Sequence, residues 1–212
     1  MEDPENTILR FDHSDISVHN IERKYDGFFK VDQYQLNHQQ YNGTNSELLT
    51  REIFERGDAV VLIPYDPIND KLVLIEQFRV GAIRTNDTPW LLEFVAGMFA
   101  ENERPIDVAI REAKEEANLT IAAHDVNYVM KFLSSPGGTS ECIHLYVANI
   151  NSENVGGVYG LPEEGEDILV HVVSRQDALI LFEQGKISNA ATIIGLQWLQ
   201  LNYKTLQGNW LK

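Results

Sequence analysis

Three carboxylates on one turn of a predicted helix are the residues of this 212-residue chain best suited to chemistry. Glu112, Glu115 and Glu116 stand in the segment PIDVAIREAKEEANL. At about 100° per residue, Glu112 and Glu116 lie about 40° apart and Glu115 lies about 60° to the other side. Oxygen ligands clustered in this way suit hard cations such as Mg²⁺ or Mn²⁺, which bridge protein to phosphate. The alternative is a solvated helix face, which is the commoner fate of such a charged run.

The elements around these carboxylates indicate how they are positioned. Pro105 suits the first turn of the helix, where its missing N–H costs nothing, and a stripe of mostly small apolar residues allows close packing on a sheet. β-branched and apolar runs predict strands on both sides of it: AVVLIPY, KLVLIEQF, WLLEFVAG, YVMKFL, IHLYVAN and DILVHVV. Helices are expected over 175–184, ending before Gly185, and from Asn189 to about Leu206. The order predicts a layered, mixed α/β domain.

The first 50 residues differ in texture and predict a small separate β subdomain, with 51–212 as the main domain. Phe29 and Val31 alternate with polar residues, whereas Tyr34 and Leu36 alternate one position out of phase. A bulge or bend near Asp32 and Gln33 would account for this change of phase.

Charge and cysteine content exclude some classes of function. The net charge is −15 and the pI about 4.7, which argues against a nucleic-acid-binding scaffold. A single cysteine, Cys142, suits a reducing cytoplasm. The acidic N-terminus does not read as a signal peptide, and the longest uncharged stretch, 187–203, is interrupted by polar residues. We therefore expect a cytoplasmic protein without a membrane or nucleic-acid partner.

The carboxylates belong to a longer pattern, G-x5-E-x7-R-E-x-x-E-E-x-x-L. Its fixed polar and glycine positions are Gly97, Glu103, Arg111, Glu112, Glu115 and Glu116. This pattern resembles the Nudix box, the loop–helix–loop of hydrolases that cleave nucleoside diphosphates linked to another moiety. The resemblance implies a Nudix-type α/β/α sandwich with a mixed sheet. The family has glycine where this chain has Asn118; we expect a left-handed helix end there, for which asparagine is the usual second choice.

The resemblance extends beyond the box. TPWLLEFVAGMF, SSPGGTSE, EDILVHVVSR and NAATIIGLQWLQL are similar to the bacterial members of the family that hydrolyse ADP-ribose, in which the position of Pro136 is associated with that substrate. This similarity implies Mg²⁺-dependent hydrolysis of ADP-ribose to AMP and ribose 5-phosphate, with Mn²⁺ as a substitute cation. It also implies a homodimer whose N-terminal subdomains contribute to the partner's substrate site.

The family pattern implies roles for particular residues. The metal ligands would be Glu112, Glu116, Glu166 and the backbone carbonyl of Ala96. Arg111 would orient carboxylates by pairing with Glu103 or Glu115, and Glu115 would be a ligand or a neighbour of one. The catalytic base would be Glu164, in the loop LPEEGED, unless that loop is merely a solvated acidic turn.

Substrate contacts are expected from two kinds of residue. Phe28 and Phe29 would offer an aromatic face to adenine, although adjacent phenylalanines are more often part of a core. The other positions, each with a structural role as the alternative, are Arg51, Glu52, Arg56, Arg79, Met98, Ser135 and Glu141.

Two competing functions remain open from the sequence. The same scaffold and metal site would serve another nucleotide sugar, such as GDP-mannose. A non-catalytic ADP-ribose-binding module would usually lack a box glutamate or carry a DNA-binding domain, and this sequence shows neither feature.

Overall fold

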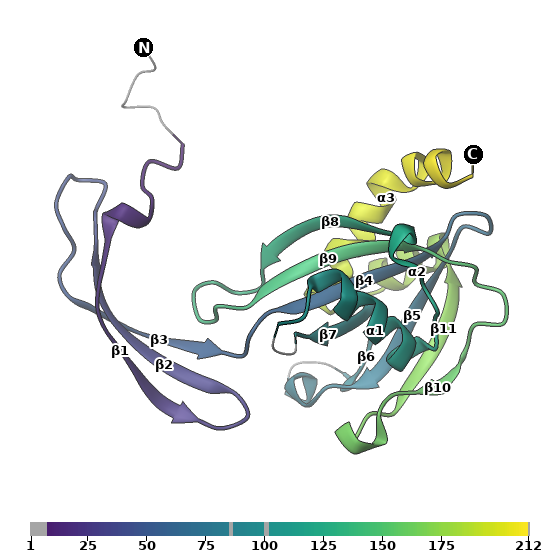
Figure 1. Ribbon diagram of the computed structural model, residues 1–212, viewed down its shortest axis with the longest axis horizontal. Coiled ribbons are helices and arrows are strands. Elements are labelled where there is room, and N and C mark those ends of the chain that lie inside the picture. The colour runs from purple at the N-terminus through teal and green to yellow at the C-terminus, as the bar shows by residue number, and fades with distance from the viewer. Residues whose placement is uncertain (1–7, 85–86, 100–101, 212) are drawn as a thin grey trace, which may run out of the picture. The chain divides into compact units, whose positions relative to one another are not determined.

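The computed structural model describes residues 8–84, 87–99 and 102–211, which form two compact units (Figure 1). The first unit comprises the described residues up to Arg56 together with Ser135–Glu141, and the second comprises the remainder. The predicted boundary between residues 50 and 51 instead falls inside strand β3 (Leu49–Glu55). Composition alone did not place the boundary after Arg56, because the first unit also includes Ser135–Glu141. This segment is distant in the chain but hydrogen-bonds to Phe54 near the end of β3.

The described part of the first unit is an antiparallel sheet in the order β1-β2-β3, with β1 at Ile16–Asp26 and β2 at Lys30–His38. A short 3-10 helix, His13–Asp15, precedes it. An irregularity does lie at this level of the sheet, but on β1: the β1–β2 register shifts between Arg23 and Tyr25, opposite Asp32 and Val31, whereas the β2–β3 register runs unbroken. Asp32 is buried because Arg23 on β1 donates two hydrogen bonds to its carboxylate, so a charged residue occupies an inward position.

The second unit is built on a mixed sheet whose described strands run in the order β10-β11-β5-β4-β9-β8. Strands β4 and β9 are parallel, and the other strand pairs in this sheet are antiparallel. The strand bounds are β4 Ala59–Asp66, β5 Lys71–Phe78, β8 Val126–Leu133, β9 Cys142–Asn149, β10 Gly157–Tyr159 and β11 Ile168–Ser174.

The run WLLEFVAG, expected as one strand, is two. Strand β6 (Trp90–Glu93) pairs with β5, and β7 (Val95–Met98) pairs with β4. Between them Phe94 is buried, and its N–H donates to the side chain of Thr192 at 3.2 Å. The ladder therefore breaks at Phe94 because a helix residue takes its N–H, and the two halves serve different neighbours.

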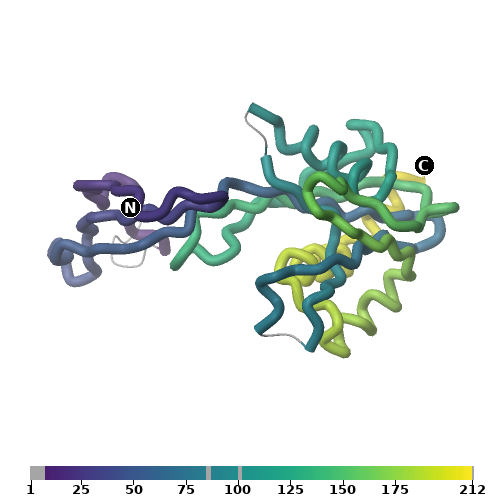
Figure 2. Tube along the Cα trace, turned by 90° about the horizontal axis from the view of Figure 1, so that it is seen from below, coloured from purple at the N-terminus to yellow at the C-terminus, as the bar shows by residue number. Residues whose placement is uncertain are grey.

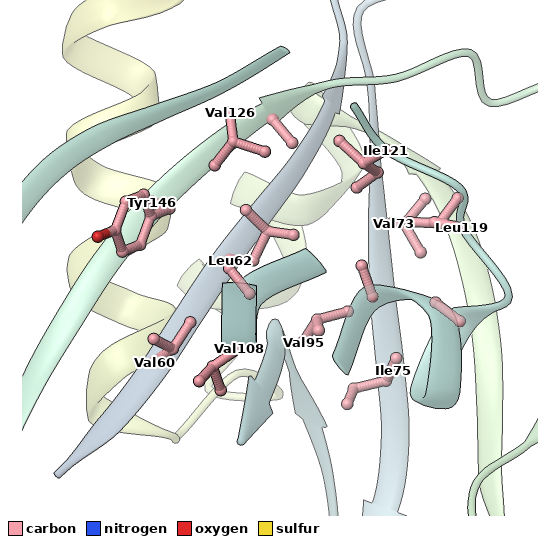
Figure 3. Packing of buried hydrophobic residues seen from close by; sticks show 14 of the residues in the cluster. Val60, Leu62, Val73, Ile75, Val95, Val108, Leu119, Ile121, Val126 and Tyr146 are labelled. Carbon is pink, nitrogen blue, oxygen red and sulfur yellow. The ribbon is translucent and has the colours of Figure 1, made fainter. Parts of the chain in front are cut away.

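Helices cover both faces of this sheet. Helix α1 (Pro105–Ala117) lies on one face, and α2 (Arg175–Glu183) and α3 (Ala190–Trp210) lie on the other (Figure 2). The side chains of β4 alternate accordingly: Val60 and Leu62 pack toward α1 (Figure 3), whereas Val61 and Ile63 pack toward α3. Each such buried side chain contributes about 1.5–3 kcal/mol. The predicted α/β/α sandwich with a mixed sheet is confirmed.

The helix ends follow local sequence. Gly185 follows α2 with φ +71°, and Asn189 caps α3 by accepting the N–H of Thr192 at 3.0 Å. Helix α3 continues to Trp210, beyond the expected end near Leu206. Among the helices in the described residues, none is long and apolar enough to cross a membrane. Short 3-10 helices also occur at Val80–Ala82, Ala123–Asp125 and Pro162–Glu164.

The turn after β4 is organised by a buried carboxylate. Asp66 accepts hydrogen bonds from Asn69 and from both the N–H and hydroxyl of Ser152, the latter at 2.9 and 2.6 Å. Burial alone would raise the pKa of Asp66, but these hydrogen bonds lower it to about 2. The ionised carboxylate therefore ties this turn to the segment that follows β9.

Candidate active site

Two of the box carboxylates lie within the buried stripe of α1. Glu112 and Glu116 are 9% and 2% exposed, and they flank Ala109, Ala113 and Ala117 against the sheet. The solvated-face alternative is therefore wrong for these two glutamates. The left-handed end expected at Asn118 is confirmed by its φ of +52°.

Glu116 is held against strand β7. Its Oε2 accepts the backbone N–H of Ala96 at 2.9 Å. Burial raises the pKa of Glu116 well above its usual range; the Ala96 N–H opposes this rise, and the nearby charges of Glu112 and Glu166 add to it. A positive charge beside this carboxylate would favour its ionised form.

Glu112 sits directly over the glycine that opens the box. A Cβ at Gly97 would lie 1.8 Å from Oε1 of Glu112 and 2.0 Å from its Cδ, so only glycine leaves room for this side chain. Burial raises the pKa of Glu112 to about 7, opposed by Arg111 and reinforced by Glu115 and Glu166. The glycine that begins the box and the glutamate in its helix therefore pack directly against each other.

Arg111 binds the remaining acidic positions together, as predicted. It donates to Glu103 at 3.1 and 3.2 Å, to Glu112 at 2.8 Å and to Glu115 at 2.9 Å. It also reaches the carbonyl of Met98, the last residue of β7, at 3.4 Å. One guanidinium therefore fixes the orientation of carboxylates from the loop and the helix.

The acidic loop is fastened to α1 through backbone. The N–H of Gly160 donates to the carbonyl of Glu115 at 3.2 Å. Glu166 folds back so that its Oε2 accepts the N–H of Leu161 at 2.9 Å. A Cβ at Gly160, where φ is +108°, would lie 2.6 Å from Cβ of Glu166, so glycine is required there.

Glu164 and Glu166 are presented differently by this loop. Glu164 ends the 3-10 helix Pro162–Glu164 and is exposed, and Gly165 follows with φ +73°. Glu166 is half-buried and close enough to raise the pKa of both Glu112 and Glu116.

The donor set fits a hard divalent cation. Within the described residues no three acidic, histidine or cysteine side chains form a ready-made metal cluster, and Glu112 and Glu116 are hydrogen-bonded to protein. Even so, two buried carboxylates with raised pKa values beside a third are carboxyl oxygens that a bound cation would stabilise in the charged form. Ala96, predicted to contribute its carbonyl, contacts Glu116 through its N–H.

Arg79 stands at the end of β5, in the same unit. Glu93, the last residue of β6, accepts a hydrogen bond from its Nε at 3.0 Å and forms an ion pair with its Nη2 at 2.9 Å. The Arg79 side chain is 44% exposed, and its charge lowers the pKa of Glu116 against the stronger effect of burial.

Several predicted substrate residues lie in the first unit. Phe28 is 86% exposed, with its ring 4.7 Å from that of Phe29, and Phe29 in turn lies beside Phe54 and under the guanidinium of Arg56. The predicted core alternative therefore does not hold for Phe28.

The remaining first-unit positions divide between β3 and the loop Ser135–Glu141. Arg51 and Glu52 are successive residues of β3, so their side chains leave opposite faces of the sheet. Ser135 is exposed, and Glu141 is buried and pairs with Arg56 at 3.3 Å.

Sequence reasoning missed Glu93, Gly160 and Asn189. Glu93 reads as an ordinary residue of an alternating strand, and Gly160 as a loop glycine. Asn189 was expected only to begin a helix, yet it also donates to Glu93 at 2.8 Å. No local signal reveals such partners, which are separated by up to 96 residues.

Comparison with known proteins agrees with this geometry. A model of the NUDIX domain matches residues 55–193. The chain belongs to the Nudix family. Members of this family generally use a divalent metal ion.

Two Nudix relatives match almost the whole chain. An ADP-ribose pyrophosphatase of Escherichia coli strain K12 is 48% identical over 207 residues, 98% of each chain. An ADP-ribose pyrophosphatase of Haemophilus influenzae is 42% identical over 206 residues, 96% of this chain and 94% of its own. The crystal structure of an ADP compounds hydrolase shares the fold, with a TM-score of 0.62, 23% identity and coverage of 87% and 94%.

Proposed function

We propose that this Nudix protein hydrolyses the pyrophosphate bond of ADP-ribose, releasing AMP and ribose 5-phosphate. The observation that carries the proposal is the buried pair Glu112, which packs against Gly97, and Glu116, which is bonded to the Ala96 N–H; burial raises the pKa of both, and a bound cation would stabilise their charged forms. The similarity of nearly the full chain to two ADP-ribose pyrophosphatases supports this substrate over another nucleotide sugar.

Mg²⁺, with Mn²⁺ able to replace it, is the proposed cofactor. Glu112, Glu116, Glu166 and the carbonyl of Ala96 would hold it. When bound, the cation neutralises phosphate charge and polarises the bond that is cleaved. Arg111 supports this set by fixing the carboxylate of Glu112, its hydrogen-bonding partner.

Glu164 is proposed as the general base that takes the proton from the attacking water. Its exposed position beside Gly165 supports this role, because a base on a loop can approach a bound substrate. Glu166, bonded to Leu161, is the better restrained of the two and therefore the better candidate for a ligand.

Substrate recognition is proposed to draw on both units. Arg79 and Met98 would contribute from the second unit. The first unit would contribute Phe28, Phe29, Arg51, Glu52, Arg56, Ser135 and Glu141.

We also propose a cytoplasmic homodimer in which each first unit serves the partner's site. Strand β1 supports the dimer, because it leaves four apolar side chains 43–62% exposed: Ile16, Val18, Ile21 and Tyr25. An exposed apolar surface of this kind is typical of a protein–protein contact. The single Cys142 supports a reducing compartment.

The test is to incubate the purified chain with ADP-ribose, GDP-mannose and other nucleotide sugars, with Mg²⁺ or with excess EDTA, and to identify products by chromatography. AMP should form from ADP-ribose only with the cation, and Glu116→Gln should abolish it. Faster cleavage of GDP-mannose would reassign the substrate, and binding of ADP-ribose without turnover would indicate a binding module. Analytical ultracentrifugation of the full chain would test the dimer.

A further inference from the structure

One edge of the Arg79 guanidinium is held by a buried carboxylate, that of Glu93. Glu93 is 3% exposed, and its Oε2 accepts hydrogen bonds from Nε of Arg79 at 3.0 Å and Nε2 of Gln77 at 3.2 Å, and lies 2.9 Å from Nη2 of Arg79 in an ion pair. Its Oε1 accepts Nδ2 of Asn189 at 2.8 Å. Both oxygens of this buried carboxylate are therefore engaged by protein donors, which restrains its orientation.

The opposite edge of the same guanidinium is open. In the described part of the chain, Nη1 of Arg79 has no protein acceptor, and the side chain is 44% exposed. A purely structural pair would bury both partners, whereas here only Glu93 is buried. The charge of Arg79 also reaches Glu116, so the open edge lies within electrostatic range of the box carboxylates.

The elements that hold Glu93 are fixed independently of substrate. Glu93 faces Ile75 across the β5–β6 ladder, which makes Gln77 its diagonal neighbour on the same face. Asn189 is the N-cap of α3 and uses its Oδ1 for that cap, leaving Nδ2 for Glu93. Sheet and helix therefore restrain the carboxylate from two sides.

We infer that Glu93, held by Gln77 and Asn189, is a positioning residue that aims the open edge of Arg79 at the pyrophosphate of the substrate. Because Arg79 meets a pyrophosphate only under the proposed function, the role of Glu93 rests on that function. The paired guanidinium is presented in one orientation before substrate arrives, so little side-chain entropy is lost on binding.

The test measures affinity without turnover as well as activity. The dissociation constant for ADP-ribose is measured by calorimetry in EDTA, and kcat and KM are measured with Mg²⁺. Glu93→Gln keeps the shape but replaces an acceptor oxygen by a donor, so Kd and KM should rise about tenfold, the effect of one charge-assisted hydrogen bond. The value of kcat should fall less than about threefold. The matched control is Glu76→Gln in β5, whose carboxylate pairs with His171 at 2.8 Å and should leave both constants unchanged.

Two further variants separate positioning from folding. Arg79→Ala should raise Kd, and adding Glu93→Gln to it should change Kd less than about twofold, because Glu93 acts only through Arg79. Asn189→Ser retains a good helix cap but lacks the donor to Glu93. It should raise Kd about threefold at an unchanged Tm, and it carries the test if Glu93→Gln fails to fold.

Two results would overturn this role. One is an unchanged Kd and KM in Glu93→Gln, or in Asn189→Ser, when the wild-type protein hydrolyses ADP-ribose. The other is an equal rise in Kd on Glu93→Gln in the wild-type and in the Arg79→Ala background. A wild-type protein that neither binds nor hydrolyses ADP-ribose would instead overturn the proposed function, and the positioning role with it.

Discussion

Replacing Gly97 by alanine should uncouple activity from folding. The backbone at Gly97 does not occupy the left-handed region, so alanine is allowed there by its dihedral angles. The three atoms nearest the new Cβ belong to the flexible side chain of Glu112, whose Oε1 lies 1.8 Å from it. Restoring a 3.0 Å contact requires that oxygen to move by about 1.2 Å. A misplacement of about 1 Å in an active site costs on the order of 10²-fold in rate.

The fold should tolerate the same change. Glycine to alanine reduces the entropy of the unfolded chain by about 0.4–1 kcal/mol, which offsets the cost of rotating one side chain. We therefore expect kcat/KM for ADP-ribose to fall about 100-fold, measured as AMP released at saturating Mg²⁺. The Tm, from circular dichroism, should change by only a few degrees.

A double variant and a control sharpen this prediction. Glu112→Asp shortens the side chain by one methylene, so Gly97→Ala should cost much less in that background than in the wild type. Gly208→Ala is the matched control, because its Cβ would meet nothing within 4 Å in helix α3. Near-normal turnover in Gly97→Ala would show that activity does not depend on the position of the Glu112 side chain against Gly97. A collapse of Tm would show that the glycine serves the fold instead.

Three other changes test separate parts of the structure. Glu164→Gln should lower kcat about 10²–10⁴-fold regardless of Mg²⁺ concentration, whereas higher Mg²⁺ should partly restore Glu166→Gln; the reverse pattern in steady-state assays would exchange their roles. Asn118→Ala should cost about 1–2 kcal/mol in urea denaturation because φ is +52°, and Asn118→Gly should cost little; equal losses would contradict this. Burial raises the pKa of Asp66, but hydrogen bonds lower it to about 2. The ionised carboxylate therefore contributes about 2 kcal/mol to the free energy of unfolding above pH 4, and this contribution is lost as the pH falls toward 2. Asp66→Asn should lose that part of the pH dependence, and an unchanged acid denaturation curve would argue against it.

The features that depended on neighbouring residues could be predicted. Helix periodicity placed Glu112 and Glu116 on one face, and capping preferences placed a left-handed residue at Asn118 and a helix start after Asn189. Alternating and β-branched runs located most strands of the main domain. The pairing of Arg111 with Glu103 or Glu115, which the family pattern implies, joins residues only a few positions apart, and Arg111 contacts both.

Other features depended on packing between distant segments and left no local signal. A continuous apolar run hid the break at Phe94, because its N–H leaves the ladder for a helix 98 residues away. The clamp of Arg79 by Glu93 likewise depends on α3, which supplies Asn189.

The sequence by itself determined which residues could act, because box spacing, caps and periodicity express interactions over one or two turns. Only the tertiary structure decided that Glu112 and Glu116 are buried, since burial depends on how closely β7 approaches α1. That approach is possible because Gly97 has no Cβ. Removal from water then raises the pKa values of both glutamates, so a cation bound between them would stabilise their charged forms.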